Sequence, residues 1–337
     1  MTMKLNSMLG IAVFLVFCSS GPFSREVIAD NDNQADAEKL LREAEEFTDI
    51  RATGSHAFHM AAHVKVFDEK AQVTEGTYSL VWKGPTDWQD KLQLGTFSQE
   101  RTAVVDKLFI SRSATSFTLE ISHLLKLLDF PGILRFSPDA KAQKLHNRIR
   151  NGSREREIEL ALPGRSAWKT IFLVESSATP TRVEYKGSHF GYRFEDYEPF
   201  DGHQFPHLLV EFDSDKPLIQ IQVQELIEAT TDDSTIAPSP NARWYLWCPH
   251  PKPITSLDAG KVFPIPWPLR GEPMKRPVAI YGVEGTDGKW HNLAVVKSGG
   301  KEVDEYWMDV MRQQRFSPAS CGDIPVVHES VREFGLH

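Results

Sequence analysis

The chain has 337 residues, of which 41% are hydrophobic and 25% are charged, and its formal net charge is −8. This composition excludes fibrous and disordered classes, and at roughly 150 residues per domain the length favours two globular domains. The negative charge leaves no basic footprint for phosphate, which disfavours a nucleic-acid partner.

Residues 1–20 have the layout of a secretory signal peptide. Lys4 precedes an apolar run from Met8 to Phe17, and small residues follow it. The run is shorter than the ~20 apolar residues that span a bilayer, so we expect no transmembrane segment in the mature chain. Cleavage after Ser20 and cleavage after Ala29 both fit this pattern.

The three cysteines bear on export in two ways. Leu15 to Cys18 resembles a bacterial lipoprotein box, in which the cysteine is acylated, but Phe17 stands where that box has a small residue. We therefore favour a periplasmic or envelope protein without a lipid anchor. Cys248 and Cys321 remain in the mature chain, and in an oxidising compartment an even pair favours a disulfide over two buried thiols.

Residues 35–228 have the pattern of one domain. Apolar positions at helical spacing over 37–47 predict an amphipathic helix, and a second helix over 121–128 is expected to end at Pro131-Gly132. Elsewhere apolar and polar residues alternate between turn residues, which predicts strands with one buried face. The expected strands span 58–66, 76–83, 88–94, 101–105, 108–113, 143–150, 154–162, 167–175, 181–187, 189–197, 207–213 and 218–228. This order predicts an α+β fold on one curved antiparallel sheet.

The stretch from Phe194 to Pro206, followed by two strands that end in Val223 to Ile227, resembles the closing hairpins of LolA-like periplasmic proteins. In that family a half-barrel with helices as a lid encloses an apolar cavity for acyl chains, so the resemblance implies a hydrophobic or lipid ligand. The inward-alternating candidates for ligand binding are Phe58, Met60, Val64, Leu80 and Trp82. Plain core packing would give the same alternation.

Residues 229–242 are polar, contain prolines and show neither the helical nor the strand periodicity of apolar residues. Such a segment is typical of an interdomain linker. In the C-terminal domain, residues 243–337, we expect strands at 278–283 and 289–297, a helix from about Val303 that Pro318 stops, and a last strand ending at Phe334. The aromatic segment from Trp244 to Trp247 fits an interdomain packing strand better than a binding platform.

Motifs at Val295 to Gly300, Val310 to Ala319 and Gly322 to Val326 make residues 262–337 similar to the TonB C-terminal domain family. The resemblance implies a small α/β module with a three-stranded antiparallel sheet whose edge adds a strand from an envelope protein partner. The residues implied for that contact are Val326, Val327, Glu329, Val331 and Glu333. A TonB-type energy transducer is an alternative, but we see neither an uncleaved anchor nor a long proline-rich reach.

The chain contains no HExxH, GxSxG, Walker or GxGxxG motif. We therefore expect no enzyme, and hence no catalytic residue, cofactor or metal. His56, His59 and His63 would share a helical face, but the surrounding alternation predicts a strand with surface histidines. The leading hypothesis is an exported binding protein, and the alternative is a structural envelope scaffold whose sheet is filled by its own side chains.

Overall fold

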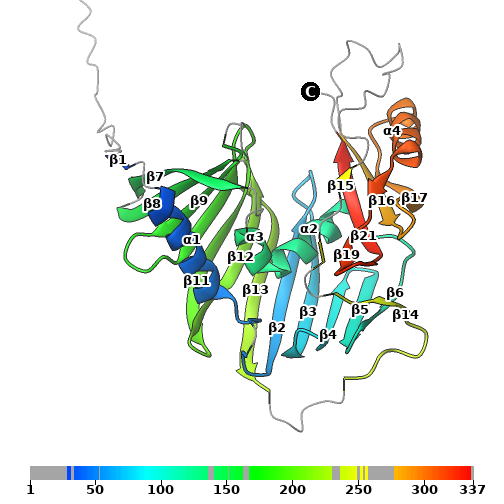
Figure 1. Ribbon diagram of the computed structural model, residues 1–337, viewed down its shortest axis with the longest axis horizontal. Helices are drawn as coiled ribbons and strands as arrows, with labels where there is room; N and C mark the ends of the chain where they lie inside the picture. The colour runs from blue at the N-terminus through cyan, green and yellow to red at the C-terminus, as the bar shows by residue number, and fades with distance from the viewer. Residues whose placement is uncertain are drawn as a thin grey trace, which may run out of the picture.

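A computed structural model describes residues 29–31, 34–52, 54–135, 140–150, 152–161, 167–229, 236–248, 251–252, 255–256 and 277–334. The expected signal peptide, Cys18, and parts of the expected linker and of the TonB-like stretch lie outside these residues. One fourteen-stranded antiparallel sheet curves around three helices, and a three-stranded sheet with a fourth helix lies beside it (Figure 1). A curved antiparallel sheet followed by a small three-stranded module is therefore confirmed.

The large sheet has the order β1-β7-β8-β9-β10-β11-β12-β13-β2-β3-β4-β5-β6-β14. Hairpins connect most neighbours, and β13 returns to pair with β2 at the centre of the sheet. The strands are β1 (Ala29–Asn31), β2 (Phe58–Phe67), β3 (Val73–Gly84), β4 (Asp87–Leu94), β5 (Phe97–Val104), β6 (Lys107–Arg112), β7 (Lys141–Arg150), β8 (Ser153–Ala161), β9 (Lys169–Val174), β10 (Pro180–Tyr185), β11 (Phe190–Phe200), β12 (His203–Asp213), β13 (Lys216–Glu228) and β14 (Arg243–Leu246).

Two local features show how particular residues fit this sheet. Asp201 and Gly202 have φ angles of 48° and 77°, so both central residues of the β11–β12 turn adopt the left-handed conformation that two-residue hairpins favour. The Asp201 carboxylate also accepts a hydrogen bond from the His56 backbone N–H (2.9 Å). On β3, a Cβ atom at Gly76 would lie 2.1 Å from the Gln93 carbonyl oxygen, so only glycine fits there.

Helices α1 (Gln34–Thr48), α2 (Leu119–Leu128) and α3 (Phe130–Leu134) lie on the concave side of the large sheet (Figure 1). The Thr118 hydroxyl caps α2 by accepting the Ile121 N–H (3.4 Å). The expectation that Pro131-Gly132 ends this helix is wrong, because α2 ends at Leu128 and Pro131 lies in the first turn of α3. A proline is tolerated there because its missing N–H would have no partner within the helix.

The core lies between these helices and the concave face. Burial alternates residue by residue along β2, as expected for a strand with one buried face. Phe130 of α3 is fully buried, with ring centroids 4.5 Å from Phe194 of β11 and 5.9 Å from Phe205 of β12. Burying one such side chain contributes about 1.5–3 kcal/mol, so the helices are held mainly by apolar contact.

The C-terminal module contains β16 (Val278–Glu284), β17 (Trp290–Lys297), β21 (His328–Phe334) and α4 (Lys301–Gln313). Two further short two-stranded sheets are present: β15 (Thr255–Ser256) pairs with β18 (Phe316–Ser317), and β19 (Ser320–Cys321) pairs with β20 (Ile324–Pro325). Strand β16 is central, and every one of its residues is buried. Ile280 packs with Met311 of α4, whereas Tyr281 belongs to the core of the large sheet. Burial on both faces explains its continuous apolar run.

The segment after the linker returns to the large sheet. Strand β14 pairs with β6, which supports the expectation of a packing strand. The Trp247 indole N–H donates to the Pro85 carbonyl oxygen (2.8 Å), and its ring lies 5.4 Å from that of Trp88. Cys248 and Cys321 form a disulfide with Cα atoms 5.7 Å apart, which confirms the predicted bridge.

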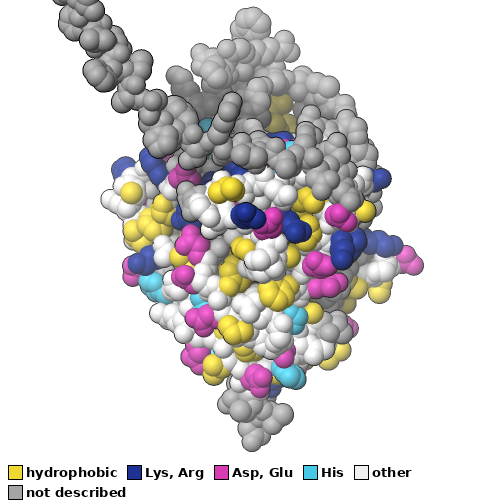
Figure 2. All heavy atoms as spheres, turned by 90° about the vertical axis from the view of Figure 1, so that its left-hand side faces the viewer, with side chains coloured by type: hydrophobic (Ala, Val, Ile, Leu, Met, Phe, Trp, Pro, Cys, Tyr) yellow, Lys and Arg dark blue, Asp and Glu magenta, His cyan; other side chains and the backbone are white. Residues whose placement is uncertain are grey.

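The molecular surface carries charged side chains of both signs (Figure 2). On the face shown in Figure 2, acidic and basic side chains are interspersed among scattered hydrophobic ones. Among the residues that the structure describes, no helix is both long enough and apolar enough to cross a bilayer.

Candidate ligand-binding site

Four of the five candidate ligand-binding side chains form two cross-strand pairs on the concave face. Phe58 lies opposite Trp82, and Met60 lies opposite Leu80. Val64 lies further along β2 on the same face, since it is an even number of residues from both Phe58 and Met60. The fold therefore brings all five onto one surface, which we call the floor.

The floor is covered in this structure. The exposed fraction of the five side chains runs from 0% for Phe58 to 8% for Trp82. They share one core cluster with apolar side chains of the helices, which include Leu124, Leu127, Phe130 and Ile133. The space above the floor is thus filled by α2 and α3, and ligand binding by these five residues stays a prediction.

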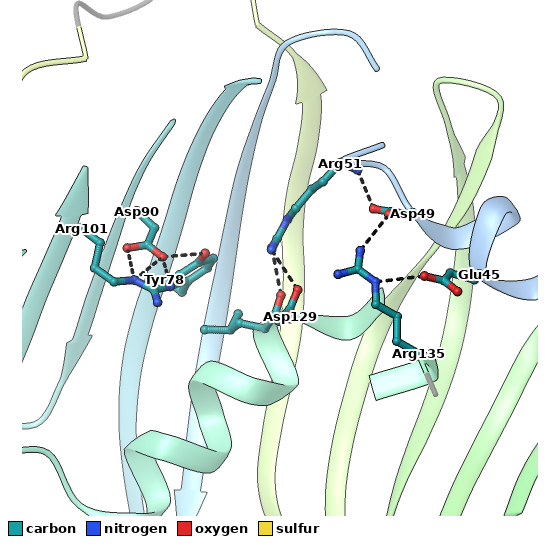
Figure 3. A network of polar contacts seen from close by, with 9 residues as sticks. Glu45, Asp49, Arg51, Tyr78, Asp90, Arg101, Asp129 and Arg135 are labelled. Atoms are coloured by element: carbon teal, nitrogen blue, oxygen red, sulfur yellow. Dashed lines mark hydrogen bonds and ion pairs between the residues drawn. The ribbon is translucent and has the colours of Figure 1, made fainter. Parts of the chain in front are cut away.

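A chain of charged side chains joins the end of α1 to the end of α2 (Figure 3). Arg51, three residues after α1, donates to the Leu128 carbonyl oxygen (2.9 Å), and it lies 3.6 Å from the Asp129 carboxylate. Its guanidinium carbon also lies 6.0 Å from the centroid of the Trp82 ring. Arg51 therefore contacts the end of α2 and the floor at once.

Arg135, directly after α3, makes the reverse connection to α1 (Figure 3). Its side chain donates to Glu45 (2.9 Å) and to Asp49 (3.4 Å). Burial alone would lower the pKa of Arg135, but the hydrogen bond to Glu45 and the nearby carboxylates raise it. The Arg135 side chain is 43% exposed, and exposed pairs of this kind are worth about 0.2–1 kcal/mol each. These contacts therefore position the helices without fixing them strongly.

A buried ion pair lies on the concave side of β4 and β5 (Figure 3). Asp90 stands between Trp88 and Leu92 on the buried side of β4, and the Arg101 Nε lies 3.1 Å from each of its carboxylate oxygens. The Tyr78 hydroxyl donates a further hydrogen bond to Asp90 (3.3 Å). Burial and the Asp90 charge raise the pKa of Tyr78, so its hydroxyl stays protonated as a donor. Such added bonds are what a buried pair requires.

A third polar group lies under the other side of α2. Glu211 of β12 is fully buried, and its Oε1 lies 2.7 Å from the His123 Nδ1 of α2. Its Oε2 is also buried and has no hydrogen-bond partner among the described residues. The cross-strand neighbour of Glu211 is Tyr192, whose buried hydroxyl interacts with Tyr185 and makes no hydrogen bond to Glu211. We call His123, Lys126, Tyr185, Tyr192 and Glu211 the α2 cluster.

Lys126 lies one turn after His123, with its Nζ 5.6 Å from the Tyr192 ring centroid and 5.8 Å from that of Tyr185. Burial lowers the pKa of Lys126, and attraction by Glu211 offsets part of this effect. Burial and the Glu211 charge raise the pKa of Tyr185 to about 12 and raise that of Tyr192 as well. Both phenols are therefore neutral donors at physiological pH.

Lys169 of β9 holds the end of α3 from below. Its side chain is 2% exposed, and its ammonium donates to the carbonyl oxygens of Ile133 and Arg135, the latter at 3.2 Å. Burial and the positive charge of Lys126 lower the pKa of Lys169 to about 8. The lysine thus caps carbonyl groups that the short helix leaves unsatisfied.

The residues predicted to receive a protein partner lie on and beside β21. Glu329 forms an ion pair with Arg112 of β6 (2.6 Å), and these side chains are only 14% and 10% exposed. Val331 packs against the core of the large sheet. Both side chains therefore dock the C-terminal module onto this chain's own half-barrel.

The other three residues predicted to contact a protein partner differ in their burial. Val326 is buried beside the disulfide, Val327 packs partly against the large core, and Glu333 is exposed. Strand β21 pairs with β16, and the described residues place no strand on its other side. Addition of a partner strand would use main-chain groups, so it stays a prediction that these side chains neither support nor oppose.

The three histidines do not converge on one site. His59 lies 3.9 Å from Glu225, and His63 lies 3.5 Å from Glu75. His56 lies 2.8 Å from Asp201 at the β11–β12 turn. Among the described residues, no group of three or more side chains is arranged to hold a metal ion.

The convex face carries a polar groove of about 480 Å³ over β3 to β6. Thr77, Ser79 and Ser111 contribute hydroxyl groups to it, and Ser239 of the linker region donates to Glu100 at its edge (2.6 Å). These are the solvent-facing residues of strands whose other side forms the core. The groove therefore lies on the opposite side of the sheet from the floor.

Two buried polar residues inside the concave face were not among the predicted site residues. Asp90 and Glu211 occupy positions where the alternation calls for apolar side chains, and both are at most 3% exposed. That break in the pattern is a signal that could have found them. Their partners His123 and Arg101 carry no comparable signal, because only the fold brings them close.

Solved structures that match this chain have low sequence identity to it. No protein-family model and no curated protein matches the chain. A LolA superfamily protein from Nitrosomonas europaea is 14% identical, covers 60% of this chain and 97% of its own, and has a TM-score of 0.40. A domain named for outer membrane lipoprotein sorting from Vibrio parahaemolyticus is 14% identical over 58% of this chain and 94% of its own, with a TM-score of 0.39. A DUF1329 family protein from Desulfovibrio piger is 10% identical over 60% and 95%, with a TM-score of 0.43.

Proposed function

We propose that this chain is an exported, non-enzymatic protein of a bacterial envelope that binds a hydrophobic or lipid ligand between the floor and helices α2 and α3. The observation that carries the proposal is the cover of the floor. The floor shares one apolar core with α2 and α3, which are helices of only ten and five residues. Withdrawal of these helices would open an apolar surface suited to an acyl chain.

Helices α2 and α3 are held by contacts that are weak enough to break when a ligand binds. A ten-residue helix is marginal on its own in water, so α2 depends on what its apolar side contacts. The charged contacts at the helix ends are partly exposed, with Asp129 at 57% and Arg135 at 43%. Such contacts break at low cost. An acyl chain would replace the contacts between α2 and the floor with equivalent apolar contacts.

Titration of the purified protein with a fluorescent fatty acid tests this function. We expect one saturable binding step that unlabelled oleate displaces. Met60→Trp adds bulk to the floor and should weaken binding at least tenfold, with Met60→Phe intermediate. Ile149→Trp, on an exposed position of β7, is the matched control and should leave binding unchanged. Thermal melts show whether each variant is folded.

A structural scaffold is the second candidate, and the burial of all five floor residues favours it. In that case the helices are permanent core elements. The fatty acid would show no saturable binding, and Phe58→Ala or Trp82→Ala would cost only about 3–5 kcal/mol of stability, as expected for large core side chains. That result would contradict the proposed binding function.

A further inference from the structure

The α2 cluster contains an unsatisfied acceptor. The Glu211 carboxylate is fully buried, and one of its oxygens has no hydrogen-bond partner among the described residues. A buried polar group without a hydrogen-bond partner destabilises the fold, and a charged group does so more strongly, so native proteins rarely contain one without a reason. The neighbouring Tyr192 hydroxyl, on the same face of the sheet, interacts with Tyr185 and makes no hydrogen bond to this oxygen. The unpaired Glu211 oxygen is therefore suited to accept a hydrogen bond from a ligand.

The same cluster contains a cation, Lys126, that Glu211 attracts without forming an ion pair with it. No carboxylate lies within ion-pair distance of Lys126 in the part of the chain that the structure describes, and its Nζ lies over the rings of Tyr185 and Tyr192. His123 directs its Nδ1 to Glu211, which leaves its Nε2 for another partner. The cluster can thus also receive a negatively charged group beside the donor.

The cluster adjoins both the surface and the floor. The Trp168 ring is 36% exposed and lies 5.8 Å from the Tyr185 ring, so an aromatic wall runs from the cluster to the solvent. In the other direction, Glu211 pairs with Ile219 of β13, and Ile219 pairs with Val66 of β2. Val66 is two residues from Val64 and shares its face of the sheet.

We infer that the ligand of the proposed site is a phospholipid whose phosphate lies next to a hydrogen-bond donor, and that the α2 cluster binds this head group. The phosphate pairs with Lys126, and an ammonium or hydroxyl group of the same head donates to the open oxygen of Glu211. Because this oxygen is covered in the present structure, the head group enters as α2 moves. The inference rests on the proposed function and deepens it.

Lipid head groups that all carry a phosphate differ in whether they can donate a hydrogen bond. Phosphatidylethanolamine carries an ammonium donor beside its phosphate, and phosphatidylglycerol carries hydroxyl donors. Phosphatidylcholine has the same phosphate, but its quaternary ammonium has no N–H or O–H to donate. A buried carboxylate accepts a charge-assisted hydrogen bond from the ethanolamine or glycerol head group. It receives no such bond from the choline head group. The donor requirement therefore predicts selection against choline.

The experiment offers the full mature protein vesicles of equal parts dioleoyl phosphatidylcholine, phosphatidylethanolamine and phosphatidylglycerol. After size-exclusion separation, mass spectrometry measures the lipid that remains with the protein. One charge-assisted bond corresponds to a preference of about tenfold or more, so we expect ethanolamine and glycerol lipids to exceed choline by that factor. The chains are identical, so only the head group can produce the difference.

Three variants assign the effect to residues. Glu211→Gln should reduce the preference to about twofold or less, because a neutral amide accepts more weakly. Lys126→Met should lower capture of all three lipids, because all three carry the phosphate. Lys91→Met, on the convex side of β4, should behave like the unaltered protein. Where Glu211→Gln does not fold, the selectivity of the unaltered protein and the Lys126→Met result decide.

The possible failures are distinct. Equal capture of the three lipids, together with saturable binding of the fluorescent fatty acid, would overturn the head-group inference and leave the proposed function standing. Absence of both lipid capture and fatty-acid binding would overturn the proposed function and the inference with it. A preference that persists unchanged in Glu211→Gln would also overturn the assignment to this carboxylate.

Discussion

Glu284 on β16 shows how a single charged side chain can be kept inside this fold. It is 1% exposed, and β21 supplies its partners: His328 Nδ1 at 2.9 Å, Arg332 at 2.8 Å and the Ser330 hydroxyl at 3.2 Å. Burial alone would raise its pKa, but the hydrogen bonds from His328 and Arg332 outweigh burial and hold the pKa below 4.5. The carboxylate therefore joins two strands in its ionised form.

The lowered pKa of Glu284 makes the free energy of unfolding depend on pH. Because the folded pKa of Glu284 is depressed, its stabilising contribution is complete above the unfolded value near 4.5 and is lost as the pH falls through the folded value. We expect the free energy of unfolding to fall between pH 5 and pH 3, and Glu284→Gln to lose part of that slope. Urea denaturation of both proteins across this range measures it. Identical slopes would show that Glu284 does not contribute.

At the scale of elements, the short helices are held by two reciprocal arginines. Arg51 reaches from the end of α1 to the end of α2, and Arg135 reaches from the end of α3 back to α1. Neither contact is strong alone, but each spans segments that no covalent turn connects directly. In the proposed binding function, the two arginines would set how easily α2 and α3 leave the floor.

Replacing these arginines should separate stability from access. We expect Arg51→Ala and Arg135→Ala each to cost about 1 kcal/mol or less, the usual worth of such pairs, while speeding uptake of the fluorescent fatty acid several-fold. Arg51→Lys keeps the charge but cannot make the same fork of bonds, so it should be intermediate. Stopped-flow fluorescence gives the uptake rate. Uptake at the original rate despite reduced stability would contradict this role.

Much of the element order could be read from the sequence because it depends on local pattern. The alternation along β2 and the Asp201-Gly202 turn each follow from residues that are neighbours in the chain. The start of α3 at Phe130 was missed because proline is a good stop signal and also a good first-turn residue. The link between His123 and Glu211 joins residues 88 apart, and no local pattern specifies it.

At the scale of the whole molecule, the C-terminal module docks on the half-barrel through a small mixed interface. Arg112 of β6 pairs with Glu329 of β21, and the Tyr245 hydroxyl of β14 lies 3.5 Å from the same carboxylate. Beside them the Phe117 and Tyr281 rings meet edge to face at 5.1 Å. An ion pair this well covered by protein is sensitive to the loss of either partner.

A double-mutant cycle measures this coupling. We expect Arg112→Ala and Glu329→Ala each to lower the unfolding free energy by about 3 kcal/mol, since each leaves a charge buried without its partner. The double variant should lose much less than the sum. The exposed pair Lys65–Glu75, 38% and 57% exposed, is the control and should couple by at most about 1 kcal/mol. A coupling no larger than that of the control would show that the interface does not depend on this pair.

The pairing of β14 with β6 has a consequence for modularity. The four residues Arg243–Leu246 lie beyond the linker, yet they complete the last edge of the large sheet, and Trp247 then packs on Trp88. A gene fusion or exchange made at the linker would therefore transfer a strand that belongs to the first domain along with the second. The unit that can be inherited or recombined intact runs at least to Cys248, and its disulfide to Cys321 extends that unit into the C-terminal module.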